Sequence, residues 1–321
     1  MNPAVIARVR DQLTAADLYA SEKLSEAEGI AREIIEKGTT TVLTGGGDGT
    51  FTVTLSQLVQ AAQERDAMAK LPRLGVLKLG TGNALAWLAG ASELGQKGYT
   101  PRPLPSASRR IRLVEHKGMF SPFAGSGADA QVLADYHSIK AQLRDTAFSG
   151  FGEGLSGYLL AGLTRTLPRA LFDTLPRVRI VNEGSPVYRV KDGQPDFENS
   201  IPKGALIYEG PARLCGVGSI PYYGFKMKMF PYAFSASDRV NLRITTLGPS
   251  EFLARLSELW RGELIADQKL FDFLIDKISI EFDHPTMAQI GGDAIGAQKK
   301  LAFAASDFEV ELVDFLAQPT L

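Results

Sequence analysis

Apolar residues form two successive strand-and-helix patterns over the first hundred residues. The run 39–43 is short and β-branched, which predicts a buried strand. A helix is predicted over 51–62, because apolar residues recur there at the spacing of one helical face, at Phe51, Leu55, Leu58, Val59 and Ala62. The same order returns about thirty residues later, with a strand predicted over 74–79 and a helix over 84–88. Such alternation predicts an α/β unit with a parallel sheet.

The pattern changes after a proline-punctuated connection at residues 100–106, which is the best boundary candidate in the chain. Short strand-like runs then dominate, and one of them, 226–230, alternates polar and apolar residues as a half-exposed strand does. The strands expected in this part cover 110–114, 178–181, 205–208, 226–230, 240–245 and 277–282. Helices are expected at 154–166 and 250–259.

Glycine turns separate the strand from the helix in both early units. The first turn is Thr44-Gly45-Gly46-Gly47-Asp48-Gly49-Thr50, and the second is Gly80-Thr81-Gly82-Asn83. Glycines let backbone N–H groups converge, and a helix N-terminus adds about half a positive charge, so phosphate is the expected ligand. A tight strand-to-helix turn without a ligand would give the same pattern. The dinucleotide fingerprint fails in every register through Gly45 to Gly49, and the Walker pattern fails because the chain contains no Gly-Lys dipeptide.

Asp48 is unusual within a phosphate-binding turn, because a carboxylate repels an anion. Its presence makes sense if Mg²⁺ or an acceptor hydroxyl also binds there, which indicates phosphoryl transfer. The alternative is a turn aspartate that bonds its own backbone. Asn83 likewise has two interpretations, one as a ligand contact and one as a cap of the following helix.

The two turns together resemble those of the diacylglycerol kinase catalytic family, which includes diacylglycerol, sphingosine and ceramide kinases and bacterial YegS-type lipid kinases. The pairing of Gly-Gly-Gly-Asp-Gly-Thr with Leu-Gly-Thr-Gly-Asn carries the likeness, and NAD kinases differ in the second motif. Later segments of the chain follow the family pattern in order and spacing, at 123–130, 157–163, 224–244 and 289–296.

The resemblance implies a fold and two domains. Residues 1–118 are expected to form a nucleotide-binding α/β domain with a parallel sheet, similar to NAD kinase and diacylglycerol kinase and possibly completed by 304–321. Residues 119–303 are expected to form a C-terminal β-sandwich domain that takes the lipid acceptor. The family opens with a strand before Asn-Pro, whereas here Asn2-Pro3 follows Met1 directly, so that strand is either absent or encoded upstream.

The resemblance also assigns roles to individual residues. Asp293 is the expected general base, with a solvated turn aspartate as the alternative, and Asp48 is expected to act with it in catalysis. Asp129 is expected to orient the acceptor, with an aspartate held by backbone N–H groups as the alternative. Asp238 is expected to bind a second, structural Mg²⁺. ATP is expected at Ser21, Gly45, Gly46, Gly47, Asp48, Gly49, Thr50, Gly80, Thr81, Gly82 and Asn83. Ser21 could instead cap a helix over 22–28.

Three departures from the family pattern concern the chemistry. The family's Asp-Gly-Glu is Gly291-Gly292-Asp293 here, so the first acid is missing and the second is one methylene shorter. The Asn-Asp after the second turn has become Asn83-Ala84, and the usual proline before Leu-Gly-Thr is Lys78. Together these changes indicate an unusual acceptor or a weakened enzyme, and the altered Asp-Gly-Glu motif favours a sphingolipid-type acceptor slightly over diacylglycerol. They leave open a kinase of a soluble acceptor such as NAD, or a nucleotide- or lipid-binding protein that has lost its base.

Composition narrows the class of protein. The chain has 321 residues, of which 45% are hydrophobic and 22% charged, as in an ordinary globular enzyme. A net charge of −1 argues against nucleic acid as the main partner. The single Cys215 excludes an internal disulfide, and neither a signal peptide nor an apolar run of about eighteen residues is present. We therefore expect an ATP- and Mg²⁺-dependent lipid kinase that is cytoplasmic and meets its lipid substrate at the membrane surface.

Overall fold

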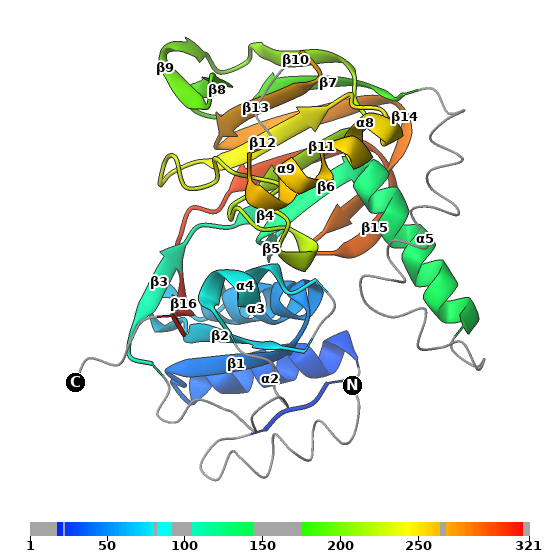
Figure 1. Ribbon diagram of the computed structural model, residues 1–321. Coiled ribbons are helices and arrows are strands. Elements are labelled where there is room, and N and C mark those ends of the chain that lie inside the picture. The colour runs from blue at the N-terminus through cyan, green and yellow to red at the C-terminus, as the bar shows by residue number, and fades with distance from the viewer. Residues whose placement is uncertain are drawn as a thin grey trace.

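The computed structural model describes residues 18–21, 23–79, 82–91, 105–143, 175–263 and 268–316. These residues form a smaller and a larger β-sheet, with helices around them (Figure 1). Across the described ranges, none of the helices combines the length and the apolar character needed to cross a lipid bilayer.

The smaller sheet is built mainly from parallel strands. Its order is β1 (Thr41–Gly46), β2 (Arg73–Lys78), β16 (Val310–Val313) and β3 (Ser108–Ile111). β1 and β16 both run parallel to β2, and β3 lies antiparallel to β16 at the edge. The strands expected at 39–43 and 74–79 are therefore confirmed with small shifts, and Figure 1 shows β16, in red, among the blue and cyan elements.

Helices pack on this sheet because one face of each is apolar. α3 (Asp48–Gln63) buries all five residues that the helical spacing singled out, and it contacts α2 (Leu24–Glu36) and β1. α3 also contacts β5 (Met119–Ser121) of the larger sheet, where the Ser56 hydroxyl accepts a hydrogen bond from the Phe120 N–H at 2.9 Å. The short α4 (Ala84–Ala89) packs on β2, and a 3₁₀ turn, η1, covers Met68–Lys70.

The larger sheet is antiparallel throughout. Its main path is β5 (Met119–Ser121), β4 (Val114–His116), β15 (Asp293–Ala305), β14 (Lys277–Ile290), β6 (Phe123–Gly127), β11 (Leu214–Gly218), β12 (Val240–Thr245), β13 (Leu270–Ile275), β8 (Val187–Lys191) and β9 (Gln194–Ile201). It branches at the long β14, which also pairs with β7 (Arg177–Asn182), and β7 pairs with β10 (Leu206–Pro211). Every residue of β11 and β12 is buried, as expected of strands covered on both faces.

Helices lie against the larger sheet at one end. α5 (Ala128–Leu143) follows β6 directly and contacts β6, β14 and β15, while α8 (Pro249–Ala254) and α9 (Leu256–Arg261) lie between β12 and β13 in the chain. The helix expected at 250–259 is thus present but broken at Arg255. The helix expected at 154–166 lies outside the described residues.

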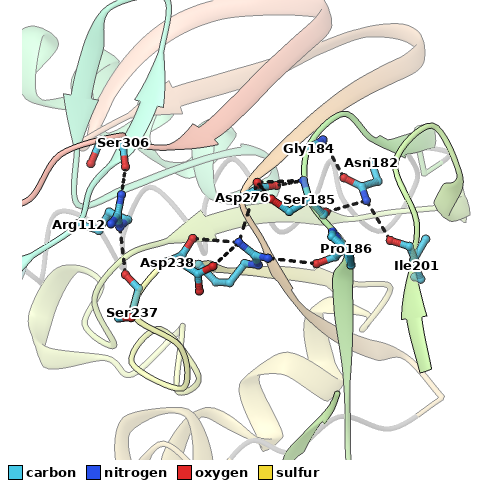
Figure 2. Close-up of polar contacts among 11 residues, drawn as sticks. Arg112, Asn182, Gly184, Ser185, Pro186, Ile201, Ser237, Asp238, Asp276 and Ser306 are labelled. Atoms are coloured by element: carbon cyan, nitrogen blue, oxygen red, sulfur yellow. Dashed lines mark hydrogen bonds and ion pairs between the residues drawn. The ribbon is translucent and has the colours of Figure 1, made fainter. Parts of the chain in front are cut away.

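The two sheets are joined by two stretches of chain, 112–113 and 306–309. Arg112 ties these stretches together, since its guanidinium donates to the carbonyl oxygens of Ser237 and Ser306 (Figure 2). One cluster of buried apolar side chains includes residues from both sheets, for example Leu74 of β2 and Phe123 of β6. The strand expected at 110–114 is therefore interrupted where the chain passes between sheets, and the expected division at residue 118 stays a prediction.

The prediction of a strand at 226–230 is wrong. Residues Gly224–Lys226 form a 3₁₀ turn, η4, and the chain continues without strand pairing. Met227 and Met229 are buried there, so the alternation reflects a segment laid against the core shared by the two sheets.

Candidate active site

The first glycine turn places a helix N-terminus at the end of a strand. Gly45 and Gly46 are the last residues of β1, Gly47 precedes the helix in extended conformation, and α3 begins at Asp48. The Thr50 hydroxyl lies over Gly46, because a β carbon built on that glycine would be 2.2 Å from Thr50 Oγ1. Since the first N–H groups of an α-helix have no acceptor within the helix, this end can bind an anion.

Asp48 joins the two glycine turns. Its Oδ2 accepts a hydrogen bond from the Ala84 N–H at 3.0 Å, and its Oδ1 accepts one from the Leu85 N–H at 3.2 Å. These two N–H groups are the first of α4, so Asp48 caps the helix that follows the second turn. Asn83 occupies the N-cap position of α4, as one of its two interpretations predicted, but its side chain makes no cap hydrogen bond, and the ligand contact stays a prediction.

Burial changes the acidity of Asp48. Desolvation raises the pKa of its carboxyl to about 6, although hydrogen bonds from Ala84, Leu85 and its own backbone oppose the shift. The carboxylate is thus not chiefly a local turn residue, because its strongest partners lie on another helix.

Asp293 lies against the first glycine turn. It begins β15, is exposed, and approaches Gly49 so closely that a β carbon on that glycine would be 2.2 Å from Asp293 Oδ2. The structure therefore brings Asp48 and Asp293, which are far apart in sequence, to the same helix end. Only a residue without a side chain at position 49 leaves room for this carboxylate.

The Gly291-Gly292 turn that presents Asp293 is fixed on both sides. Gly291 has φ of +59°, donates its N–H to the Phe123 carbonyl at 2.9 Å, and sits against Thr52 of α3. Gly292 donates its N–H to Gln289 Oε1 at 3.0 Å. Two glycines fit here because both have positive φ, which L side chains rarely adopt.

Asp129 belongs to a buried polar cluster next to this turn. Its Oδ2 accepts hydrogen bonds from the Tyr223 hydroxyl at 2.9 Å and from Gln289 Nε2 at 3.3 Å, and Gln289 also contacts the Tyr223 oxygen at 3.0 Å. Its Oδ1 is buried and has no hydrogen-bond partner among the described residues. Burial raises the pKa of Asp129, opposed by bonds from the Ala130 N–H, Tyr223 and Gln289. Because Gln289 also holds Gly292, the cluster connects Asp129 to the turn of Asp293.

The second glycine turn contacts η4. The Gly82 carbonyl accepts a hydrogen bond from the Phe225 N–H at 3.1 Å, and a β carbon on Gly82 would be 3.4 Å from the Gly224 α carbon. The same β carbon would be 3.3 Å from Asp48 Oδ2. Gly82 is therefore enclosed between the first turn and a loop of the larger sheet. Gly80 and Thr81 lie outside the described residues.

Two predicted residues lie away from these contacts. Ser21 is exposed in the loop before α2, whose N-cap is Lys23, so the interpretation of Ser21 as a helix cap is wrong and its nucleotide role stays a prediction. Asp238 is bonded to Arg239, with 2.7 Å between Oδ2 and Nη1, and Arg239 also lies 3.9 Å from Asp276 (Figure 2). A metal at Asp238 would compete with this guanidinium, and the metal role of Asp238 stays a prediction.

Sequence reasoning did not predict Gln289 and Tyr223. Gln289 stood at the head of the segment 289–296, and no motif singled out Tyr223. The signal available for both was a polar group within an otherwise apolar run, but their shared partner Asp129 is 160 and 94 residues away in sequence.

Comparisons with known proteins show what this chain is similar to. Residues 3–113 match the family model of the diacylglycerol kinase catalytic domain. A probable lipid kinase, YegS-like, from Enterobacter sp. (strain 638) is 30% identical over 162 residues, which are 50% of this chain and 49% of that protein. The chain thus matches about half the length of this curated relative.

Two solved structures from Bacillus anthracis str. Sterne that bear the name diacylglycerol kinase have the same fold. One has a TM-score of 0.57 at 16% identity, and the match covers 97% of this chain and 91% of that chain. The other has a TM-score of 0.56 at 18% identity, and the match covers 92% of this chain and 85% of that chain. The predicted fold class and the predicted family resemblance are both confirmed.

Proposed function

We propose that this protein is a lipid kinase that transfers the γ-phosphoryl group of ATP to a lipid hydroxyl, because residues 3–113 match the family model of the diacylglycerol kinase catalytic domain. The observation that carries the proposal is the position of Asp293 over Gly49, at the N-terminus of α3. A helix end that can hold phosphate and a carboxylate that can take a proton are thus adjacent.

Different residues of this chain have separate roles in the phosphoryl transfer. The backbone of residues 46–50 holds the phosphates, and Thr50 adds a hydroxyl. The acceptor oxygen forms a bond to the γ-phosphorus while the bond from that phosphorus to the bridging oxygen of ADP breaks. Asp293 takes the proton of the acceptor hydroxyl. Asp129, with its buried Oδ1 free of hydrogen bonds to described residues, orients the acceptor head group.

A Mg²⁺ ion fits this arrangement. Mg²⁺ sites in kinases use one or two carboxylates together with phosphate oxygens and water, and Asp48 supplies one carboxylate at this helix end. The ion would neutralise negative charge on the phosphates. No group of three or more acidic, histidine or cysteine side chains that could hold a metal occurs among the described residues, so an all-protein metal cage is not part of the proposal.

The acceptor is proposed to be a ceramide-like, sphingoid or diacylglycerol lipid. The shorter Asp293 in place of glutamate favours the sphingolipid type. The lipid would be met at the membrane surface.

The test is transfer of radiolabelled phosphate from ATP to a panel of mixed micelles containing diacylglycerol, sphingosine or ceramide, with NAD as a soluble acceptor. We expect label in one lipid and its loss by at least about a hundredfold in Asp293→Asn. Asp192→Asn is the matched control, because Asp192 is an exposed turn residue between β8 and β9. If label appears in NAD alone, the acceptor is a soluble molecule and the proposal of a lipid acceptor is wrong. ATP binding with no transfer to any acceptor would identify a binding protein.

A further inference from the structure

Two lysines from different parts of the chain approach the same aromatic ring. The ammonium nitrogen of Lys78 lies 3.8 Å from the centroid of the Trp87 ring, and that of Lys226 lies 5.3 Å from it. Each ammonium is attracted to the ring, but the two like charges repel each other. Two positive charges therefore lie close together at one ring, and an anion bound by both would reduce their mutual repulsion.

This positive charge lies beside both glycine turns. Lys78 is the last residue of β2 and pairs in register with Gly46, the last residue of β1. Lys226 ends η4, whose Phe225 N–H donates to the Gly82 carbonyl. Trp87 itself is on α4, the helix that Asp48 caps. The lysines thus reach the turns from the smaller sheet and from the larger one.

The glycine turns need positive charge from elsewhere. Two acids, Asp48 and Asp293, lie within the first turn or against it, and neither turn contains a lysine or arginine. A nucleoside triphosphate carries several negative charges, whereas the N–H groups at a helix N-terminus supply only about half a unit of positive charge. Lys78 and Lys226 are placed to supply the remainder.

The turn that contains Lys226 has a strained backbone conformation. Phe225 and Lys226 have φ of +58° and +64°, which non-glycine residues rarely adopt. Trp260 Nε1 donates to the Phe225 carbonyl at 3.0 Å, so the turn is held from both sides. Strain maintained by such contacts is typical of functional segments. The residue before the turn, Tyr223, contacts Asp129, so one short segment spans the acceptor and phosphate sides.

We infer that Lys78 and Lys226 bind the phosphate groups of the nucleotide, and that Lys226 makes the larger sheet part of the nucleotide site. This inference rests on the proposed function for the identity of the ligand. The bound nucleotide then bridges the end of β2 and η4, and it stabilises the contact between Gly82 and Phe225.

The test is calorimetric titration of the full chain with ATP, ADP and adenosine, which measures binding without turnover. We expect Lys78→Met and Lys226→Met each to weaken ATP binding by about tenfold, and to weaken adenosine binding little, because methionine keeps the aliphatic stem and removes the charge. Lys228→Met is the matched control, since Lys228 is two residues away and its ammonium bonds the Arg261 carbonyl instead. Its ATP affinity should equal that of the wild type.

A second variant separates binding from folding. Lys226→Gly should keep or raise the melting temperature, because glycine accepts positive φ, and should still lose ATP affinity about tenfold. Wild-type affinity for ATP in the Lys78→Met and Lys226→Met variants would overturn the inference. ATP binding that depends on the lysines, with no transfer to any acceptor, would support the inference and overturn only the proposed activity. Absence of ATP binding by the wild type would overturn both.

Discussion

The carboxylate of Asp48 accepts a hydrogen bond from the backbone N–H of Ala84 at 3.0 Å. A residue of the first glycine turn thereby closes the end of the helix after the second turn, and the two phosphate-binding elements have a fixed relative position. The carboxylate is buried to do this, and its pKa rises to about 6. The proton affinity of Asp48 is therefore coupled to the stability of the site.

We expect Asp48→Asn to change how stability depends on pH. The folded pKa of about 6 lies above the ordinary value of 3.8, so the native state binds this proton more tightly than the unfolded state. The contribution of Asp48 is fully present below pH 4 and is lost as the pH rises through 6, on the order of 3 kcal/mol. Urea unfolding of both proteins at pH 4.5 and pH 7.5 measures it. The stability of the variant relative to the wild type should rise with pH, and a constant difference would contradict a raised pKa.

Gly49→Ala should separate activity from stability. The new β carbon would overlap Asp293 Oδ2, so the carboxylate must move away from the helix end, whereas alanine favours the helix by about 0.5–1 kcal/mol. We expect a loss of phosphoryl transfer of at least about tenfold, with an unchanged or higher melting temperature. Gly29→Ala in α2 is the matched control, because its β carbon would meet nothing within 4 Å. Full activity in Gly49→Ala would mean that the position of Asp293 is not critical.

Gln289→Glu should destabilise the protein in a pH-dependent way. The substitution puts a second carboxyl group next to Asp129, at the 3.3 Å position of the amide nitrogen, where both cannot ionise without strong repulsion. We expect a loss on the order of 3 kcal/mol at pH 8 and a smaller loss at pH 5, measured by urea unfolding. Gln194→Glu, at the exposed start of β9, should change stability little at either pH. Equal losses at both pH values would point to packing, not charge.

Asp238→Asn tests the expected structural metal. Because Arg239 already bonds this carboxylate at 2.7 Å, we expect Mg²⁺ to shift the melting temperature of the chelator-treated wild type and of the variant equally. A stabilisation by Mg²⁺ that is present in the wild type and absent in Asp238→Asn would establish a metal at Asp238.

Local sequence patterns predicted the two strand-and-helix units well. The face of α3 follows from helical spacing alone, and all five residues that define it are buried. The segment 226–230 was assigned wrongly because its conformation depends on distant partners: Gly82 and Trp260 hold Phe225, and neither is near in sequence.

The site likewise combines local motifs, which the sequence predicts, with contacts between residues that are distant in sequence. Glycine turns and the two aspartates were visible as motifs, because each motif is local. The capping of α4 by Asp48 joins residues 36 positions apart, and the bond between Gln289 and Asp129 joins residues 160 apart. No periodicity encodes such pairs, so they follow only from the arrangement of the sheets.

The central place of β16 has a consequence for biosynthesis. This strand lies between β2 and β3 and is the described partner through which β3 joins the smaller sheet. Residues 310–313 leave the ribosome after every strand of the larger sheet has been synthesised. The glycine turns are therefore translated early, yet the sheet that carries them must wait for these late residues, with one side of β2 open to other partners in the meantime.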